Sequence, residues 1–225
     1  MDYSHFMNNS ATLETGRRER RKQETLHKLM TAAIQLFATQ GYANTAVEDI
    51  TEKADVGKGT FFNYFPTKDA LLLAIFDALA ERFLQFRLEI PKITDVRQAL
   101  TEFTHGTLHE PSRSPKIIQG VFGTALTEPV IGKRLQEVIM VARKTVVELF
   151  EHGQKIGQVR TDIPAVLLGR NYQQFIFGTQ IMWIFAEQED LHAWVDTMLE
   201  IFWTGAHAPS QSKAPTPNKK SHKEK

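Results

Sequence analysis

The sequence predicts an all-α protein with a small three-helix unit at the N-terminus and a larger helical region after it. Three observations favour this class. Apolar residues recur at helical spacing through nearly the whole chain. No alternating pattern of useful length predicts a strand, and glycine or proline separates the periodic segments. With 225 residues, 42% of them hydrophobic, the chain is long enough to bury one sizeable core or two small ones.

Composition excludes several classes of site. The chain has no cysteine, so disulfides, thiolate nucleophiles and cysteine metal sites are excluded, and we expect a cytoplasmic protein. The first residues place a basic cluster after polar ones with no apolar run behind it, unlike a signal peptide. No segment approaches the roughly 20 apolar residues of a membrane span. We therefore expect no membrane partner.

Charge is unevenly distributed. The net charge is +1, but the tail after residue 207 holds five lysines against one glutamate, so residues 1–207 sum to −3. Both ends, 1–19 and 208–225, are polar and lack periodicity, which predicts disorder. The basic run RRERRK fits either an arm that clamps phosphates or a solvated helix start. Between the ends we expect a small unit over 20–66 and a larger one over 67–207.

The first helix is predicted over about residues 20–39, followed by Gly41 as a helix stop. Its apolar residues fall on one face: Leu26, Leu29, Met30, Ala33, Ile34, Leu36 and Phe37. A second helix is predicted to begin at Thr45, because Glu48 follows three residues later as in a capping box. We expect Asp55 to occupy the left-handed turn position that ends it.

A third short helix is predicted in GKGTFFNYF. Phe61 and Phe65 are four residues apart and anchor one face. Two short helices joined by so tight a turn cross steeply, which is the helix-turn-helix geometry. Lys58, Asn63 and the other polar residues of this helix are not needed to pack the core.

The stretch from Gly41 to Leu72, GYANTAVEDITEKADVGKGTFFNYFPTKDALL, resembles the DNA-binding signature of the TetR family of transcriptional regulators. The close resemblance covers about residues 20–75; beyond them only the helical layout matches. Two positions depart from the family pattern: Asp55 stands where glycine is usual, and Gly57 stands where serine often opens the recognition helix. Gly57 offers no hydroxyl to a phosphate.

Double-stranded DNA is therefore the partner that we expect for the third helix. Gly59 allows close approach of the backbone, while Thr60 and Asn63 are able to reach base edges. Phosphates would meet Lys58, Lys68, Tyr64 and the helix N-terminus at Thr45. The predicted DNA-binding residues are Thr45, Gly57, Lys58, Gly59, Thr60, Phe62, Asn63, Tyr64 and Lys68. A solvated face is the alternative, but exposed aromatic rings argue against it.

Thr67 is predicted to cap a long helix over about 68–90 that Pro91 stops. Further helices are predicted over about 95–109, 115–127, 131–156, 163–187 and 190–206. The last two are apolar on most sides, which predicts a two-fold dimer built from helix pairs, as the resemblance also implies. The predicted interface residues are Phe177, Ile181, Ile184, Trp194, Met198, Ile201 and Trp203. A thick single-chain core is the alternative.

The larger region is rich in aromatic residues, which favours a site for a small apolar or aromatic molecule. The candidate pocket residues are Phe83, Phe86, Phe103, Phe122, Phe150, Tyr172, Gln174 and Phe175. The same residues are also compatible with a plain core. A ligand that shifted the long helix after Thr67 would change the separation of the two recognition helices and release DNA.

Catalysis is the rival class. Glu102, His105 and His109 share a helix face and could in principle hold a metal, but that face lies opposite the apolar stripe and is expected to see water. No phosphate loop, nucleophile elbow or paired carboxylate appears elsewhere, so no enzyme, cofactor or metal is expected. The prediction is a ligand-responsive repressor that binds a palindromic operator as a homodimer. The alternatives are a constitutive dimeric DNA binder and a helical enzyme or metal protein.

Overall fold

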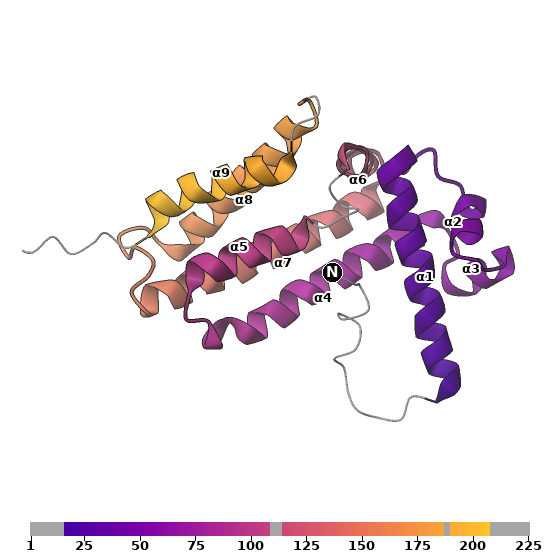
Figure 1. The fold of residues 1–225 in the computed structure, drawn as a ribbon, viewed down its shortest axis with the longest axis horizontal. Coiled ribbons are helices and arrows are strands. Elements are labelled where there is room, and N and C mark those ends of the chain that lie inside the picture. Colours follow the sequence, from indigo (N-terminus) through magenta and orange to yellow (C-terminus); the bar gives the residue numbers. More distant parts are fainter. Residues whose placement is uncertain (1–15, 109–113, 187–189, 208–225) are drawn as a thin grey trace, which may run out of the picture.

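The computed structural model describes residues 16–108, 114–186 and 190–207. Over these ranges every named element is helical, so the all-α class is confirmed (Figure 1). In chain order the elements are α1 (Arg17–Gln40), α2 (Val47–Lys53), α3 (Lys58–Tyr64), α4 (Lys68–Glu89), the 3-10 turn η2 (Ile90–Lys92), α5 (Val96–Thr107), α6 (Pro115–Thr127), α7 (Pro129–Lys155), α8 (Ala165–Trp183) and α9 (Leu191–Ala206).

Two residues with positive φ shape the N-terminal unit. Gly41 ends α1 at φ 87°, and Asp55 follows α2 at φ 54°, in the left-handed region that the sequence predicts for it. The short α2 and α3 pack beside the C-terminal half of α1 (Figure 1). The predicted helix-turn-helix is therefore present.

The start of α1 differs from the prediction. The helix begins at Arg17, so residues 17–19, expected in a disordered arm, are helical, and the run RRERRK forms the first turns of α1. Arginine, lysine, glutamate and glutamine are good helix formers, and Gly16 precedes them with a non-helical ψ of 152°. The predictions for residues 1–15 and 208–225 lie outside the described residues.

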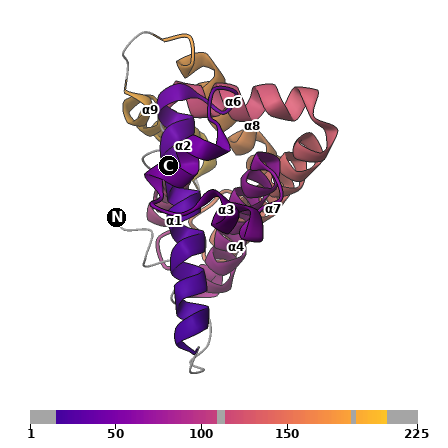
Figure 2. The same cartoon turned by 90° about the vertical axis from the view of Figure 1, so that its right-hand side faces the viewer.

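Beyond Pro66, long helices pack side by side. Helix α4 runs along α7, α7 also contacts α8, and α8 pairs with α9, while α6 lies across the C-terminal end of α1 (Figures 1 and 2). Helix α8 is shorter than predicted and starts after Pro164; α7 starts earlier than predicted, with Pro129 in its first turn. None of the described helices combines the length and the hydropathy that crossing a bilayer requires.

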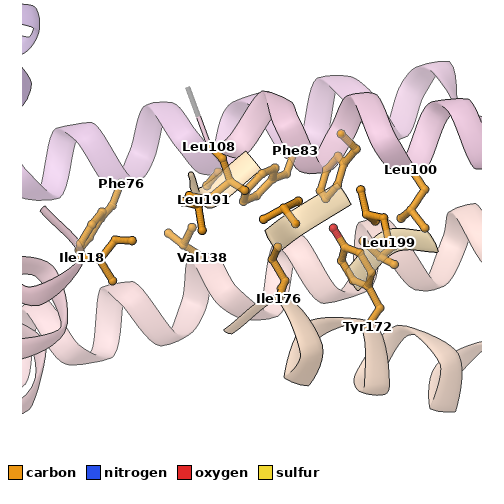
Figure 3. Close-up of a cluster of buried hydrophobic side chains, with 14 of the residues drawn as sticks. Phe76, Phe83, Leu100, Leu108, Ile118, Val138, Tyr172, Ile176, Leu191 and Leu199 are labelled. Atoms are coloured by element: carbon orange, nitrogen blue, oxygen red, sulfur yellow. The ribbon is translucent and has the colours of Figure 1, made fainter. Parts of the chain in front are cut away.

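The core is continuous from the N-terminal unit to α9. Its members are buried side chains from every long helix, as Figure 3 shows for Phe76 and Phe83 of α4, Leu100 of α5 and Tyr172 of α8. Helices α7 and α8 approach closely at Gly169, where an added Cβ would lie 2.5 Å from a Val147 methyl group. Packed side chains therefore connect the larger region with the helix-turn-helix.

Candidate nucleic-acid interface

Buried side chains fix the orientation of α3. Ile50 of α2 and Phe61 of α3 are fully buried, as are Leu29 and Ala33 of α1. The rings of Phe61 and Phe65 lie 5.7 Å apart, which extends the anchor along α3. Because one face of this short helix is fixed, its opposite face is held at the surface.

We call Lys58, Gly59, Thr60, Phe62 and Asn63 the outward face of α3. Thr60 is partly exposed and the other four are exposed. The Phe62 ring is 46% exposed although it is large and apolar. At Gly59 an added Cβ would meet nothing within 4 Å, so the backbone faces open space. Gly57, also exposed, precedes the helix in an extended conformation. The structure therefore brings together most of the residues that the sequence singles out.

Tyr64 has a structural contact that the sequence did not indicate. Its hydroxyl donates a hydrogen bond to the carbonyl oxygen of Lys22 over 3.2 Å, and the side chain is half-buried. This bond joins the end of α3 to the second turn of α1. Tyr64 therefore positions α3 as well as lying near its outward face.

The predicted cap at Thr45 is wrong. Thr45 is 2% exposed, and its hydroxyl donates to the carbonyl oxygen of Gly41 over 2.8 Å. The backbone N–H of Ala46 instead bonds the Asp49 carboxylate at 2.9 Å, and α2 starts at Val47. The Thr45 side chain is therefore turned back to the end of α1 and does not cap α2.

Lys68, predicted as a phosphate contact, makes two hydrogen bonds within the protein. Its ammonium group donates to the carbonyl oxygens of Tyr42 at 2.7 Å and Thr45 at 2.8 Å. Burial lowers the pKa of the Lys68 ammonium group, although the neighbouring Asp69 opposes that shift. The cation is therefore occupied inside the protein, where it holds the loop between α1 and α2.

Lys58 forms an ion pair with Glu48 of α2. The hydrogen bond from Lys58 lowers the pKa of the Glu48 carboxyl group. Both side chains are more than half exposed, at 57% and 61%, so the pair contributes little and is readily exchanged. Lys58 remains available to a phosphate at the cost of this contact.

A junction that the sequence did not reveal links α1, α4 and α6. The Tyr42 hydroxyl donates to the Asp69 carboxylate at the start of α4, and burial, followed by this bond, raises the pKa of Tyr42. At Gly120 of α6 an added Cβ would lie 3.2 Å from Tyr42 Cβ. Ser114 and Lys116, at the start of α6, donate to the last carbonyl groups of α1. Tyr42 and Asp69 lie within the family-like stretch, but only the fold brings them together.

The predicted pocket aromatics mostly pack against one another. Phe103 contacts Phe83 at 5.3 Å and Phe86 at 4.9 Å between ring centroids. Phe150 is fully buried, and Phe122 meets Phe177 at 5.8 Å. Inside this cluster the Tyr172 hydroxyl bonds Thr104 at 2.6 Å, and burial raises the pKa of Tyr172 (Figure 3).

Two predicted pocket residues are exposed. Gln174 projects from the outer side of α8. Phe175 is 49% exposed and lies at the edge of the cluster, where its ring centroid is 6.1 Å from that of Phe202. The structure also has a groove of about 170 Å³ between α5 and α9, lined in part by Arg97, Glu200 and Trp203. This groove does not involve the predicted aromatics.

The predicted interface residues divide between surface and core. Ile181 and Ile201 are exposed, at 37% and 64%, whereas Met198 is only 7% exposed and belongs to the core of its own chain. Phe177, Ile184, Trp194 and Trp203 are partly buried against that core. Two further residues that the sequence did not single out are exposed: Met182 of α8 at 58%, and Phe185, two residues beyond the end of α8, at 77%.

The candidate metal cluster is not assembled in the described residues. Glu102 accepts a hydrogen bond from Gln98, while His105 contacts Asp196 at 2.8 Å and His192 at 2.7 Å. His109 lies outside the described residues. The described residues contain no group of three or more suitable metal-binding side chains. The expectation that His105 faces only water is wrong, because α9 packs against it.

Comparisons with known proteins agree with this geometry. The model for bacterial regulatory proteins of the tetR family matches residues 29–75, from the middle of α1 into α4. The chain is 39% identical over 69 residues to the HTH-type transcriptional regulator TcmR of Streptomyces glaucescens, a match covering 31% of this chain and 30% of TcmR. It is 28% identical over 145 residues to the HTH-type transcriptional repressor DhaR of Mycobacterium sp. (strain GP1), covering 62% of this chain and 72% of DhaR.

The fold is similar to solved structures over most of its length. A TetR transcription regulator from Haloarcula marismortui superposes with a TM-score of 0.66 at 21% identity, over 82% of this chain and 99% of the other. These proteins are regulators and not enzymes. The helix-turn-helix and the family match identify residues 29–75 as a DNA-binding segment of the tetR family of bacterial regulatory proteins. The fold beyond this segment is shared with the TetR regulator from Haloarcula marismortui.

Proposed function

We propose that the protein is a repressor that binds a palindromic operator as a homodimer and is released by a small apolar molecule. The observation that carries the proposal is the outward face of α3. It presents an exposed phenylalanine, two polar side chains and an open glycine on a helix whose other face is fully anchored. Residues 20–66 would bind DNA, and residues 67–207 would dimerise and bind the ligand.

The chemistry of the outward face suits the major groove. The Asn63 amide is able to pair with an adenine edge, Thr60 is able to bond either partner of a base pair, and Phe62 is able to contact a thymine methyl group. Gly59 allows the backbone to come close to a phosphate. Specificity would therefore come from Thr60, Phe62 and Asn63.

A second copy of the chain would cover the outer surfaces of α8 and α9. Phe175 and Met182 lie seven residues apart on α8, Phe185 follows just beyond the end of the helix, and Ile201 lies exposed on α9. Monomeric proteins seldom expose apolar residues so closely grouped. A two-fold axis through this surface would place two α3 helices on half-sites about 34 Å apart.

The route from ligand to DNA would run through α4 and α6. Helix α4 follows α3 after Phe65, Pro66 and Thr67, and α6 is bonded to the end of α1. Since the aromatic cluster is closely packed, a ligand that enters it must displace a helix. Such a displacement would alter the spacing of the two α3 helices.

The proposal is tested by selecting bound fragments from the source genome and measuring affinity for the selected sequence. The Asn63→Ala change should weaken operator binding by about 1 to 3 kcal/mol through one base position and leave nonspecific binding unchanged. A Glu52→Ala change, on the exposed surface of α2, is the matched control. Normal operator binding by a folded Asn63→Ala protein would remove α3 from recognition.

The ligand part has a separate test. Compounds that release the operator should bind the free dimer more tightly than the DNA complex. The ratio of these two ligand affinities must equal the factor by which the ligand lowers the affinity for DNA, because linkage is reciprocal. Calorimetry measures both ratios. If no compound releases DNA, the constitutive dimeric binder becomes the better description.

A further inference from the structure

We propose that the first turns of α1 form a second DNA-binding surface, which holds backbone phosphates beside the base pairs that α3 contacts. We call its residues Arg20, Arg21 and Lys22 the α1 ridge. The inference rests on the proposed function, since it assigns a further part of the same DNA interface. Its occupant is the phosphate backbone of the duplex.

The α1 ridge lies next to α3 and extends beyond it. Figures 1 and 2 both show the N-terminal half of α1 running past the ends of α2 and α3. The hydrogen bond from the Tyr64 hydroxyl to the Lys22 carbonyl oxygen ties the end of α3 to this part of α1. A duplex held against α3 would therefore extend alongside the ridge.

The side of α1 that packs on α2 and α3 becomes basic as the helix leaves them. Lys22 lies seven residues before Leu29, so the two share a helix face within about 20°. Leu29 is fully buried, whereas Lys22 is exposed. The helix face that is buried in the C-terminal half of α1 is therefore exposed and cationic in the N-terminal half.

Charge supplies the strongest reason for a second surface. Residues 47–64, which contain α2 and α3, carry two basic side chains against four acidic ones, a net charge of −2. One of the two, Lys58, is paired with Glu48, and Lys68 just beyond is bonded inside the protein. Affinity for DNA depends largely on neutralised phosphates. Residues 17–28 carry six basic side chains against two acidic ones, a net of +4, and so provide the missing charge.

The ridge side chains are available for phosphates. Arg20 pairs with Glu24 at 3.4 Å, but the two side chains are 70% and 60% exposed, so the pair is weak and exchangeable. Arg21 and Lys22 are exposed and make no ion pair with another residue of the described chain. Ordering them on DNA therefore breaks no strong contact.

The test is the salt dependence of DNA binding by full-length protein. We compare wild type with an Arg21→Gln/Lys22→Gln double variant and with a Lys133→Gln/Lys144→Gln control, which removes the same charge from exposed positions on α7. The slope of log K against log salt should fall by about 0.9 for each lost phosphate contact, or about 1.8 per bound chain. The control should keep the wild-type slope.

Both the selected operator and a scrambled duplex are used. The double variant should bind both duplexes more weakly than wild type by the same factor, because phosphate contacts carry no sequence information. An Arg21→Lys/Lys22→Arg variant, which keeps both charges, should restore the slope. Trimming the base pairs that flank the contacts of α3 should reduce the slope for wild type but not for the double variant.

Three results would overturn the inference. One is a wild-type slope in a folded double variant. A second is loss of operator binding alone, which would mean that the ridge only positions α3. The third is a loss that the charge-preserving variant fails to restore. Failure of the proposed function is distinct: wild type would then show no preference for any selected sequence over the scrambled duplex.

Discussion

The ammonium group of Lys68 lies 2.7 Å from the Tyr42 carbonyl oxygen and 4.3 Å from the centre of the Tyr42 ring. A second carbonyl group, that of Thr45, accepts from the same ammonium at 2.8 Å. One cation at the start of α4 therefore holds the loop that leads into α2. The orientation of the helix-turn-helix relative to the larger region depends on this contact.

Replacing Lys68 with Met should therefore reduce stability more than it reduces phosphate binding. Hydrogen bonds to charged groups contribute about 1.5 to 3 kcal/mol, so we expect a loss of that order in the free energy of unfolding by urea. The salt slope of DNA binding should remain that of wild type. Lys53→Met, on the exposed end of α2, is the control and should leave stability unchanged. A lower salt slope with normal stability would return Lys68 to the DNA interface.

Two glycines of α6 offer a matched pair for the junction with Tyr42. At Gly120 an added Cβ would lie 3.2 Å from Tyr42 Cβ, whereas at Gly123 it would meet nothing within 4 Å. Gly123→Ala should stabilise by about 0.5 to 1 kcal/mol through helix propensity. Gly120→Ala should lose that gain, because overpacking costs about 1 to 3 kcal/mol. Equal gains in thermal unfolding would show that α6 does not press on Tyr42.

The outer surface of α8 and α9 should determine the oligomeric state. Met182→Asp or Ile201→Asp would bury an unpaired charge in the proposed interface and should yield folded monomers in analytical ultracentrifugation. Operator affinity should collapse with the dimer. Leu126→Asp, at a position that is 87% exposed on α6, should remain dimeric. Dimers in both α8 and α9 variants would place the interface elsewhere.

Tyr172 should make the protein sensitive to alkaline pH. Burial raises the pKa of its hydroxyl above the ordinary tyrosine value of 10.0, so the native state keeps a proton that the unfolded chain loses. This contribution is fully present below pH 10 and is lost as the pH rises through the unfolded value towards the native one. Stability should fall by up to about 1.4 kcal/mol per pH unit in that window for this one group.

The Tyr172→Phe variant isolates that contribution. At neutral pH it should cost only about 1 kcal/mol, because Thr104 still donates to the Leu100 carbonyl oxygen at 2.6 Å. Above pH 10 its stability should fall less steeply than that of wild type, as measured by urea midpoints at a series of pH values. Parallel curves would mean that the native Tyr172 hydroxyl ionises as readily as in the unfolded chain.

Local sequence patterns were enough to predict the helix class, most helix limits and the outward face of α3. These features depend on local spacing: Phe61 and Phe65 recur at helical period, and Asp55 tolerates the left-handed turn. Local chemistry was also enough for the Thr67 cap, whose side chain accepts from the Ala70 N–H.

Which polar residues are free to bind a partner depends on how segments far apart in the sequence pack together. Thr45 and Lys68 carry donors that suit a phosphate. In the structure the Thr45 hydroxyl donates to the Gly41 carbonyl oxygen, and the Lys68 ammonium group donates to the carbonyl oxygens of Tyr42 and Thr45. Gln174 lies outside the aromatic cluster and Phe175 lies at its edge, because the register of α8 turns both towards the outer side. A polar side chain that lies near an unsatisfied backbone carbonyl group will donate a hydrogen bond to it. Helical periodicity does not predict which distant residues come close enough, because that depends on how the helices pack.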